Sequence, residues 1–448
     1  MRRRSIAVAL AALASGCALH PEGEDVERER AAEQGRAYEK PWEARDLPAL
    51  PANAPWKEIL RRSFLANGEL EARWWEWRAA LERIPQEASP RTTAAFFFEH
   101  MIQGGDSTAW ERTFLGAGND PMFNIPWPGK LTTAGRRALE EARAAGLRFE
   151  RSKFDLQRRV IESYQDWALL GERLRIGEAR VALLGAVRAA AEGRISAGRG
   201  AQFELLQART QEDLAVNALE SLRARVPVER ARLNALAGRG AGEPLDLPGG
   251  MPEPRSLAYS EAELIRLAAE RSPEVLALAR DIEAGKEGIR LAELEFVPEF
   301  GLSGGADLGG IAQTIGGMIT MPILRYEAIR GGIEEARARL EAASAMRRQA
   351  SSDAAARMLL DLRGFSDAER QIALFQASIL PRADMALAST RAGYASGAVS
   401  LRDLLESSRM LLEAREMLAQ LLAEREKMLA DLEALAAVDA EARVEPGV

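Results

Sequence analysis

Apolar residues recur at helical spacing over most of the chain, and a stretch near the C-terminus shows the pattern most clearly. Between Leu401 and Ala437, apolar residues repeat at seven-residue steps: Leu404, Leu411 and Leu418, then Leu421, Met428 and Leu435. A sustained seven-residue spacing of apolar residues is typical of helices that pack along one another as a coiled coil. The pattern therefore predicts a helix that packs lengthwise against other helices.

The same order of predicted helices occurs twice, roughly 200 residues apart. Each copy contains an opening helix, a long helix and a shorter closing helix. Their ranges are Trp56–Glu87, Leu131–Ile195 and Gln202–Ala237 in the first copy, and Glu261–Phe296, Tyr326–Ala395 and Leu401–Ala437 in the second. Each long helix would span about 100 Å, which is too long for a globular domain. We predict a mainly α chain with a small β portion and an internal two-fold repeat.

Short motifs support the duplication. Both long helices contain Glu-Glu-Ala-Arg, at 140–143 and 334–337, and both end at a glycine turn, at 196–201 and 395–400. Glycine favours the end of a helix, and Ser400 can cap the next one. A closing helix and an opening helix together match one long helix in length, which suggests a hollow barrel of helices. Pro227 and Pro381 lie inside predicted helices, where we expect kinks or breaks.

Stretches rich in glycine, threonine and phenylalanine follow both opening helices and interrupt the helical period. We predict four strands in them, at Thr92–Gln103, Pro121–Trp127, Glu299–Asp307 and Ile311–Met321. Phe96, Phe98 and Ile102 share one face of their strand, as do Ile311, Ile315 and Ile319 of another. The remaining aromatic residues have two interpretations, an interfacial girdle or core packing: Phe97, Phe123 and Trp127.

The first residues form an export signal. Arg2–Arg4 are basic, residues 6–14 are apolar, and small residues lead to Cys17, the only cysteine. This order resembles a bacterial lipobox, in which Cys17 becomes the lipid-carrying N-terminus, and Ala18 after it favours the outer membrane. The alternative is an ordinary signal peptide beside an unrelated cysteine. From Ala18 to Pro51 no period is sustained, so we predict a tether.

Composition excludes several classes of function. After the signal no run of 18 apolar residues occurs, so no membrane-spanning helix is predicted, and any spanning structure would have to be a closed β-barrel. The net charge is −7 and becomes −10 once three arginines of the signal are removed, which argues against nucleic acid. His20 and His100 lie far apart and outside any ligand-spaced cluster. We therefore expect no metal site, no cofactor and no enzyme activity.

These observations predict six segments. They are a signal peptide at 1–16, a lipidated tether at 17–54, a first repeat at 55–237, a Gly/Pro-rich linker at 238–260, a second repeat at 261–438 and a tail at 439–448.

The order of these motifs in two copies resembles the TolC-like outer-membrane efflux protein family. The resemblance rests on the helix restarts at 126–130 and 322–324, on the two glycine turns, and on residues 397–406 most closely. It implies a homotrimer in which each protomer gives four strands to a shared twelve-stranded barrel in the outer membrane, above a periplasmic tunnel of helices. The implied function is a passive exit duct that works with a periplasmic adaptor and an inner-membrane pump.

The resemblance also assigns roles to the glycine turns. Asp403 and Glu406 match acidic residues that line a closed aperture, and three-fold symmetry would make each a ring of carboxylates that favours cations. The alternative is a solvated helix face, because acidic residues are favoured near a helix N-terminus. Glu204 and Gln207 stand at the equivalent positions of the first copy. The expected adaptor-docking residues could instead simply end and cap helices: Gly198, Gly200, Gly397 and Ser400.

The sequence says less about the exported substrate than about the fold. The Pro-Trp-Pro-Gly-Lys motif at 126–130 resembles the heavy-metal efflux branch, so metal cations are the first expectation, with drugs as the other. A periplasmic coiled-coil scaffold or adaptor lipoprotein without a pore is the alternative function, and it would need no strands. A hydrolase is disfavoured because no histidine-centred constellation is present.

Overall fold

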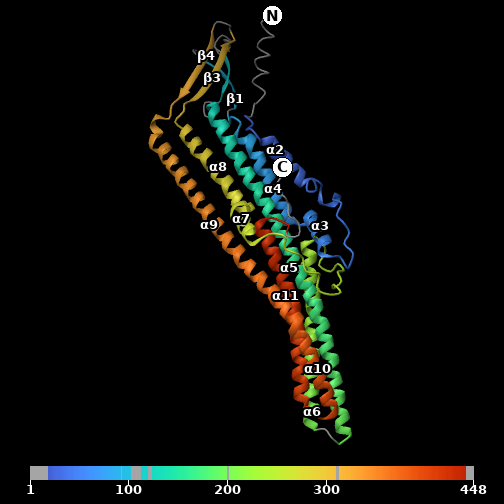
Figure 1. The fold of residues 1–448 in the computed structure, drawn as a ribbon. Helices are drawn as coiled ribbons and strands as arrows, with labels where there is room; N and C mark the ends of the chain where they lie inside the picture. The colour runs from blue at the N-terminus through green and yellow to red at the C-terminus, as the bar shows by residue number, and fades with distance from the viewer. Residues whose placement is uncertain are drawn as a thin grey trace. The chain divides into compact units, whose positions relative to one another are not determined.

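The computed structural model describes residues 19–91, 93–101, 113–119, 124–198, 201–308 and 312–439, and it is mainly helical, as predicted (Figure 1). Its α-helices are α2 (Glu24–Gly35), α3 (Trp56–Ala66), α4 (Gly68–Glu87), α5 (Pro128–Ser196), α6 (Gln202–Leu236), α7 (Glu261–Arg271), α8 (Pro273–Leu294), α9 (Tyr326–Leu374), α10 (Leu380–Ser396) and α11 (Leu401–Ala436). None of the described helices combines the length and the apolar character that crossing a membrane requires.

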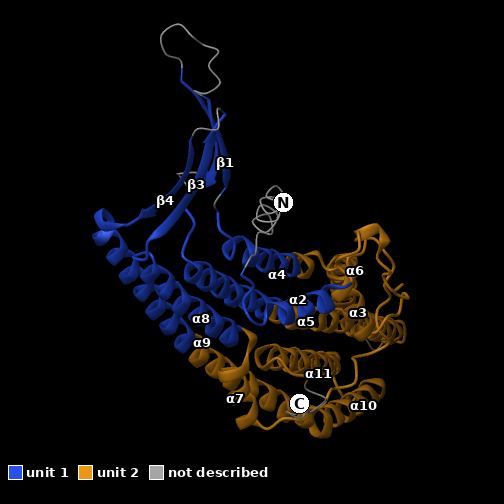
Figure 2. Ribbon diagram, turned by 90° about the horizontal axis from the view of Figure 1, so that it is seen from above, with its two compact units in different colours: residues 1–36, 73–149, 274–349 blue, residues 37–72, 150–273, 350–448 orange. Residues whose placement is uncertain are grey.

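The chain divides into two compact units (Figure 2). Unit 1 contains residues 1–36, 73–149 and 274–349, and unit 2 contains residues 37–72, 150–273 and 350–448. Each unit combines segments from both predicted repeats, because the long helices α5 and α9 continue from one unit into the other. This division does not test the boundaries predicted for the two repeats, which remain a prediction.

Unit 1 carries one antiparallel sheet in the order β1-β2-β3-β4, formed by β1 (Ala94–His100), β2 (Thr113–Asn119), β3 (Glu299–Asp307) and β4 (Gln313–Thr320). The prediction for β3 is confirmed at both ends, and β1 and β4 lie inside their predicted ranges. The two strands from each half of the sequence thus meet in one sheet, with β2 beside β3.

The predicted strand Pro121–Trp127 is wrong. The second strand is β2, and of the predicted range the described part makes only an isolated bridge between Ile125 and Phe300. In the predicted segment Phe123, Ile125 and Trp127 alternate as in a strand, whereas the large apolar residues of β2, Phe114 and Leu115, are adjacent and lie on opposite faces. Residues 120–123 and Ile311 lie outside the described residues.

The predicted tether is also corrected, since residues 24–35 form helix α2, which packs within unit 1. The indole Nε1 of fully buried Trp74 donates to the Ala31 carbonyl at 2.8 Å. A Cβ on Gly35 would lie only 1.8 Å from atoms of the Trp74 ring, so glycine is required for this approach. The Glu24 carboxylate, 2% exposed, accepts a bond from Arg28 Nε at 2.7 Å.

Neither predicted opening helix is continuous. Asn67 separates α3 from α4, and its side-chain oxygen accepts bonds from the Glu69 and Leu70 amides, both at 3.1 Å. Ser272 separates α7 from α8, where Pro273 begins the second helix. Asn67-Gly and Ser272-Pro are both helix-ending dipeptides, and they break both opening helices at matching positions, which supports the internal repeat.

A buried network of charges fixes the end of the linker in unit 2. Arg255 donates to Glu426 and to Glu433, each at 2.9 Å, and none of the three side chains is more than 7% exposed. Arg425 contacts Glu426 and donates to the Arg255 carbonyl at 2.9 Å. The predicted linker is thus tied to α11 near its end.

The two prolines at which a kink or break was expected behave differently. The helix predicted from Tyr326 to Ala395 is interrupted by a π-helical turn, η4 (Phe375–Ile379), directly before Pro381. Helix α6, in contrast, continues through Pro227 from Gln202 to Leu236. A break is therefore confirmed at Pro381, while no break occurs at Pro227.

Candidate functional site

The second glycine turn joins α10 to α11 at the tip of unit 2. Gly397 ends α10 with φ of 81°, a left-handed conformation that favours glycine. Ser400 then caps α11, because its hydroxyl oxygen accepts from the Asp403 amide at 3.3 Å while the Asp403 carboxylate accepts from the Ser400 amide at 3.2 Å. This reciprocal arrangement is a capping box. Sequence reasoning identified the cap correctly.

Asp403 and Glu406 both lie on the exposed surface of the first turns of α11. Hydrogen bonds from Ser400 hold the pKa of the Asp403 carboxyl below its ordinary value, so it stays ionised at neutral pH. Their three-residue separation places the two carboxylates on one helix face. The capping box gives Asp403 a structural role, whereas Glu406 takes no part in the capping box.

The first glycine turn differs from the second. Gly198 also has a left-handed φ, of 72°, whereas Gly200 lies outside the described residues. Ala201 occupies the N-cap of α6 and offers no side-chain cap. Glu204, at the position equivalent to Asp403, is half-buried, and its Oε2 has no hydrogen-bond partner within the described part of the chain. The two copies are therefore unequal at the tip.

Two residues that the sequence analysis missed join the hairpins at this tip. The Arg194 guanidinium of α5 lies 4.8 Å from the ring centroid of Tyr394 on α10, within the range of a cation–π contact. Tyr394 is 3% exposed, and its burial raises its pKa. The ring packs in a core cluster with residues from three further helices: Val187, Ala208, Leu401 and Leu404. Both residues precede a glycine turn within four positions, which is the only sequence signal that could have found them.

A groove of about 400 Å³ lies beside this contact, between α5 and α10. Its walls are mostly apolar and small, with two basic groups, Arg194 and Arg391, on opposite helices. The tip therefore presents a concave, basic-rimmed surface between two helices, next to both glycine turns.

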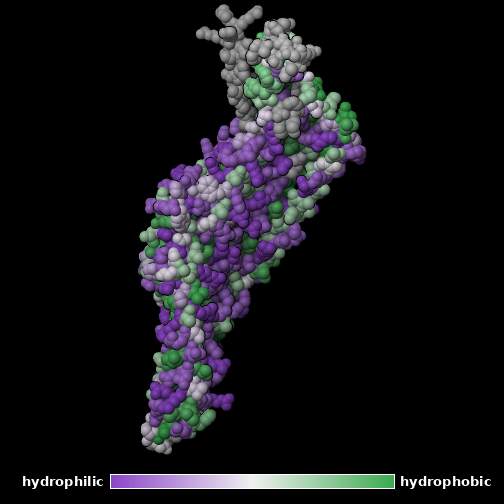
Figure 3. Space-filling view, turned by 180° about the vertical axis from the view of Figure 1, so that it is seen from behind, coloured by the Kyte–Doolittle hydropathy of each residue, from purple (hydrophilic) through white to green (hydrophobic). Residues whose placement is uncertain are grey.

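The sheet of unit 1 has two chemically different faces. Strand pairing places seven large apolar side chains on one face, where they are between 37% and 90% exposed: Phe96, Phe98, Leu115, Phe300, Leu302, Ile315 and Ile319. Figure 3 shows hydrophobic side chains gathered around the strands, at the top of the view, above a largely hydrophilic helical surface. An exposed apolar face of this kind marks a surface made for a non-aqueous or protein partner.

The opposite face is mostly polar or small. It carries the carboxylates of Glu99, Glu299 and Asp307, together with glycines and hydroxyl groups. The rings of Phe97 and Phe114 stack on this face, 5.8 Å apart, and fill the space above Gly116 and Gly305, where a Cβ would meet them at 2.0 and 2.3 Å. No lysine or arginine occurs within the four strands.

Comparisons with known proteins agree with this geometry. Residues 264–438 match the family model described as outer membrane efflux protein. The structure superposes on that of the outer-membrane channel OprN with a TM-score of 0.71, covering 89% of this chain and 94% of that one at 17% identity. Over residues 264–438 the chain is thus similar to the outer membrane efflux protein family. The TolC-like fold expected from the sequence is thereby confirmed.

Two proteins with similar sequences are resistance proteins. The fusaric acid resistance protein FusA of Burkholderia cepacia is 28% identical over 242 residues, which are 50% of this chain and 43% of FusA. The cobalt-zinc-cadmium resistance protein CzcC of Cupriavidus metallidurans is 25% identical over 292 residues, which are 62% of this chain and 66% of CzcC. The matched part is thus less than two thirds of either relative.

The structure places the remaining residues that the sequence analysis singled out. Cys17 lies outside the described residues, but the amide of Leu19, two positions later, donates to the Ala88 carbonyl at 3.2 Å. His20 bonds Glu24 and His100 bonds Thr113, so both histidines have structural partners. Across the described segments, no group of three or more His, Cys, Asp or Glu side chains could hold a metal ion.

Proposed function

We propose that this protein is the outer-membrane exit duct of a tripartite export system and conducts its substrates passively. The observation that carries the proposal is the sidedness of the sheet, with seven exposed apolar side chains on one face and carboxylates, hydroxyls and glycines on the other. Alternating apolar and polar faces are what a transmembrane β-barrel presents to lipid and to its lumen. A coiled-coil scaffold without a pore would need no such sheet.

The edges of the sheet support a trimer. The described sheet begins at β1 and ends at β4, so the outer edges of these two strands have no neighbouring strand among the described residues of this copy. Four strands cannot close on themselves, and an unpaired edge inside a membrane is very costly. Three copies would give twelve strands and remove every edge by closing them into a barrel.

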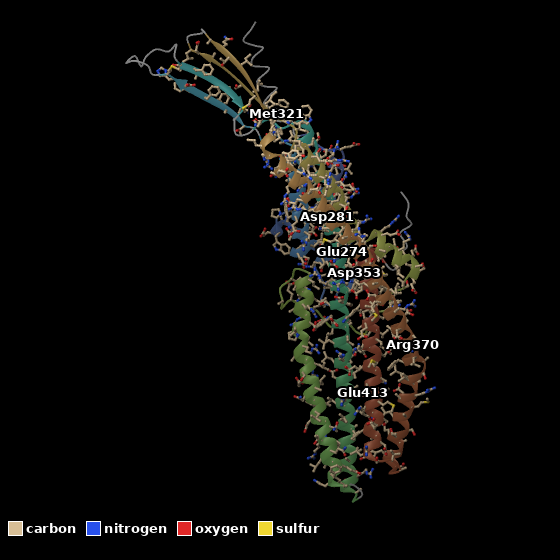
Figure 4. The ribbon with its side chains drawn as sticks, turned by 90° about the vertical axis from the view of Figure 1, so that its left-hand side faces the viewer. Glu274, Asp281, Met321, Asp353, Arg370 and Glu413 are labelled. Carbon is tan, nitrogen blue, oxygen red and sulfur yellow. The ribbon has the colours of Figure 1, made fainter. Side chains whose placement is uncertain are left out.

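Residues at the base of the sheet fit a membrane boundary. Trp127 is 46% exposed and its ring lies 6.1 Å from Phe300, while Tyr326 is 55% exposed and contacts Phe296. Aromatic side chains of this kind favour the interface between lipid and water. Figure 4 places Met321 where β4 meets the helices, at the same base of the sheet.

The position of the N-terminal segment supports a lipid anchor near the base of the sheet. Leu19 is bonded to Ala88, just before β1, and Cys17 precedes it by only two residues. Two residues reach at most about 7 Å, so an acyl chain on Cys17 would enter the membrane close to the base of the sheet. Lipidation of Cys17 therefore fits the proposed barrel in position.

In this proposal the tip of unit 2 would face the periplasm and the partner proteins. We assign the aperture to Asp403 and Glu406, whose exposed carboxylates would form rings in a trimer. The adaptor would dock on the turns at Gly198, Gly200, Gly397 and Ser400. The names of FusA and CzcC, together with the motif at 126–130, make metal cations or small organic drugs the proposed substrates.

The sheet offers a matched pair of variants that tests the proposal. Ile315 and Thr314 are neighbours on opposite faces of β4, and Ile315 is 90% exposed. Arginine on the lipid face near the midplane costs about 2–4 kcal/mol, whereas lumen positions tolerate charge. In detergent extracts of outer membranes, Ile315→Arg should lose most of the heat-stable trimer, and Thr314→Arg should retain it. Equal yields of both variants, or a soluble monomer once the lipid is removed, would favour the scaffold.

A further inference from the structure

A polar pocket of about 500 Å³ lies in unit 1, close to the base of the sheet. Its walls come from three segments, which are residues 19–22, the part of α5 between 132 and 143, and the part of α8 between 280 and 287. The pocket begins about one turn after the start of α5, and Leu19 in its wall is bonded to Ala88, shortly before β1. A pocket of this size suits a small molecule or the polar part of a larger one.

The pocket is lined by charges of both signs. Its ionisable side chains are three arginines, one histidine and four glutamates. Most of them are paired within the protein: Glu140 accepts from Arg143 at 2.5 Å and from Arg280 at 3.3 Å, and Glu283 accepts from Lys286 at 2.7 Å. The groups that keep unused bonding capacity therefore decide what the pocket would bind.

Two groups of opposite charge keep such capacity. Arg136 is exposed, and no hydrogen bond or ion pair joins it to any residue that the structure describes. The Glu287 side chain is only 14% exposed; its Oε1 accepts from Arg290 at 2.6 Å, whereas its Oε2 is buried without a donor among the described residues. Glu22, exposed and also without a described partner, adds a second carboxylate. The pocket thus offers a guanidinium to an anion and a carboxylate oxygen to a cationic donor.

A ligand that carries both charges suits these walls better than a simple ion. An anion alone would face four carboxylates, and a cation alone would face three guanidinium groups. A phosphate is well matched to the planar guanidinium of arginine, and an ammonium donates charge-assisted hydrogen bonds to a carboxylate. Phosphoethanolamine, the headgroup of a common phospholipid, carries both groups a few atoms apart. Phosphocholine has no N–H to donate, so it would leave the Glu287 oxygen without a partner.

We propose that this pocket binds the phosphoethanolamine headgroup of a membrane lipid, with the phosphate on Arg136 and the ammonium on Glu287. That the ligand is a lipid rests on the proposed function, in which the sheet lies in the membrane and the pocket lies just beyond its base. Arg136 is about 12 Å along α5 from Pro128. Side chains on a helix lean toward its N-terminus, which for α5 is the end nearest the sheet. The long arginine side chain is therefore directed toward the headgroup layer.

Lipid retention by the purified full-length protein in detergent tests the proposal. Native mass spectrometry after incubation with equal amounts of three lipids should show phosphatidylethanolamine bound about tenfold more than phosphatidylcholine or phosphatidylglycerol. The choline lipid lacks the N–H donor, and the glycerol lipid lacks the cation. Equal retention of the three lipids would overturn the proposed site.

Matched variants locate the binding. Arg136→Gln should lower retention of phosphatidylethanolamine about tenfold, because it removes the partner of the phosphate. Arg137→Gln is the control, since Arg137 is the next residue of α5, lies outside this pocket and pairs with Glu141 at 2.9 Å. Glu287→Gln should reduce the preference for phosphatidylethanolamine over phosphatidylglycerol, while Glu293→Gln, further along α8, should not. Equal losses in the two arginine variants would show only general attraction to phosphate and would overturn the site.

A soluble headgroup separates a lipid from a free small molecule. Glycerophosphoethanolamine has no acyl chains to hold it in the membrane or detergent, so it should displace the lipid only at a concentration at least about a hundredfold higher. Displacement at equal concentration would assign the pocket to a soluble zwitterion and overturn the lipid. Channel recording on the same preparation separates the pocket from the duct. A protein that prefers the ethanolamine lipid without conducting would reject the duct alone, and one that conducts without this preference would reject the pocket alone.

Discussion

The Lys130 ammonium lies 3.2 Å from the Glu299 carboxylate and joins the first turn of α5 to the first residue of β3. The lysine side chain is 8% exposed, while Glu299 is 37% exposed and Glu295 lies further away, at 3.9 Å. A cation is unfavourable at a helix N-terminus, so Lys130 depends on these carboxylates. This ion pair therefore fixes the position of the start of β3 relative to the start of α5.

The unequal burial of this pair predicts unequal effects. Glu299→Gln leaves a nearly buried ammonium with a weaker partner and should destabilise the protein by about 1–3 kcal/mol. Lys130→Met keeps the packing and lets the half-exposed carboxylate be hydrated, so its cost should be below about 1 kcal/mol. Thermal unfolding of both variants in detergent measures the difference. A larger loss for Lys130→Met would contradict this account of the junction.

Helix α2 should detach when its contact with Trp74 is blocked. In Gly35→Ala the added methyl would overlap the Trp74 ring, at a cost of about 1–3 kcal/mol. Limited proteolysis should then cut the segment between α2 and α3 faster than in the unmodified protein. Gly68→Ala is the control, because nothing lies within 4 Å of its Cβ position. Equal cutting rates in the two variants would show that the close approach is unimportant.

The sequence could predict most helices because their apolar stripes bury large cores, but it missed α2 for a physical reason. The buried face of α2 consists of Glu24, Glu27, Ala31 and Gly35, which recur at helical spacing without being large or apolar. Its burial depends on ion pairs and on one tight glycine contact, neither of which hydrophobic periodicity detects.

The strands and the tip of unit 2 also contain features that hydrophobic periodicity does not detect. Strand β2 was missed because its two large apolar residues, Phe114 and Leu115, are adjacent and give no alternating pattern. The capping box at Ser400 was predictable, since its partners lie three residues apart. Arg194 and Tyr394 could not be paired from the sequence, because their contact depends on how the two hairpins pack together.

Asp431 should contribute stability that is lost as the pH rises from about 4 to 7. Burial and the nearby Glu162 raise the pKa of its carboxyl from 3.8 to about 6, partly offset by Arg158, and Asp361 adds to the rise. The folded state therefore binds this proton more tightly than the unfolded state does. The stabilisation is complete below pH 3.8 and is lost as the pH passes through about 6.

Asp431→Asn removes this dependence and is the matching test. Because the Asp431 side chain is 35% exposed, the effect should be only on the order of 1 kcal/mol. Denaturant unfolding at pH 4 and at pH 7 should show a smaller difference for Asp431→Asn than for the unmodified protein. The same difference in both proteins would rule out Asp431 as its source.

The N-cap residues of α6 and α11 predict that adding a serine to one helix and removing it from the other have opposite effects on stability. Ser400→Ala removes the cap of α11 and should cost about 1 kcal/mol, while Ala201→Ser gives α6 a cap that it lacks and should stabilise it by a similar amount. Hydrogen exchange in the first turns of α6 and α11 measures both effects. Slower exchange of α11 in Ser400→Ala would contradict the observed capping box.

The carboxylates at the tip should control block by cations. In the proposed aperture, Asp403 and Glu406 attract divalent ions, so Asp403→Asn with Glu406→Gln should weaken cation block of the channel by about tenfold or more. Glu413→Gln, which removes an exposed charge two turns further along α11, is the control. Unchanged block in the double variant would remove Asp403 and Glu406 from the aperture.

Single-channel recording in a planar bilayer tests the central claim most directly. The purified full-length protein should form trimers that open stable, cation-conducting channels, because the polar face of the sheet carries carboxylates and its strands carry no lysine or arginine. Preparations of Ile315→Arg should yield few such channels, and Thr314→Arg should conduct with altered selectivity. A membrane-bound protein that never conducts, under conditions in which its trimer is intact, would contradict the duct.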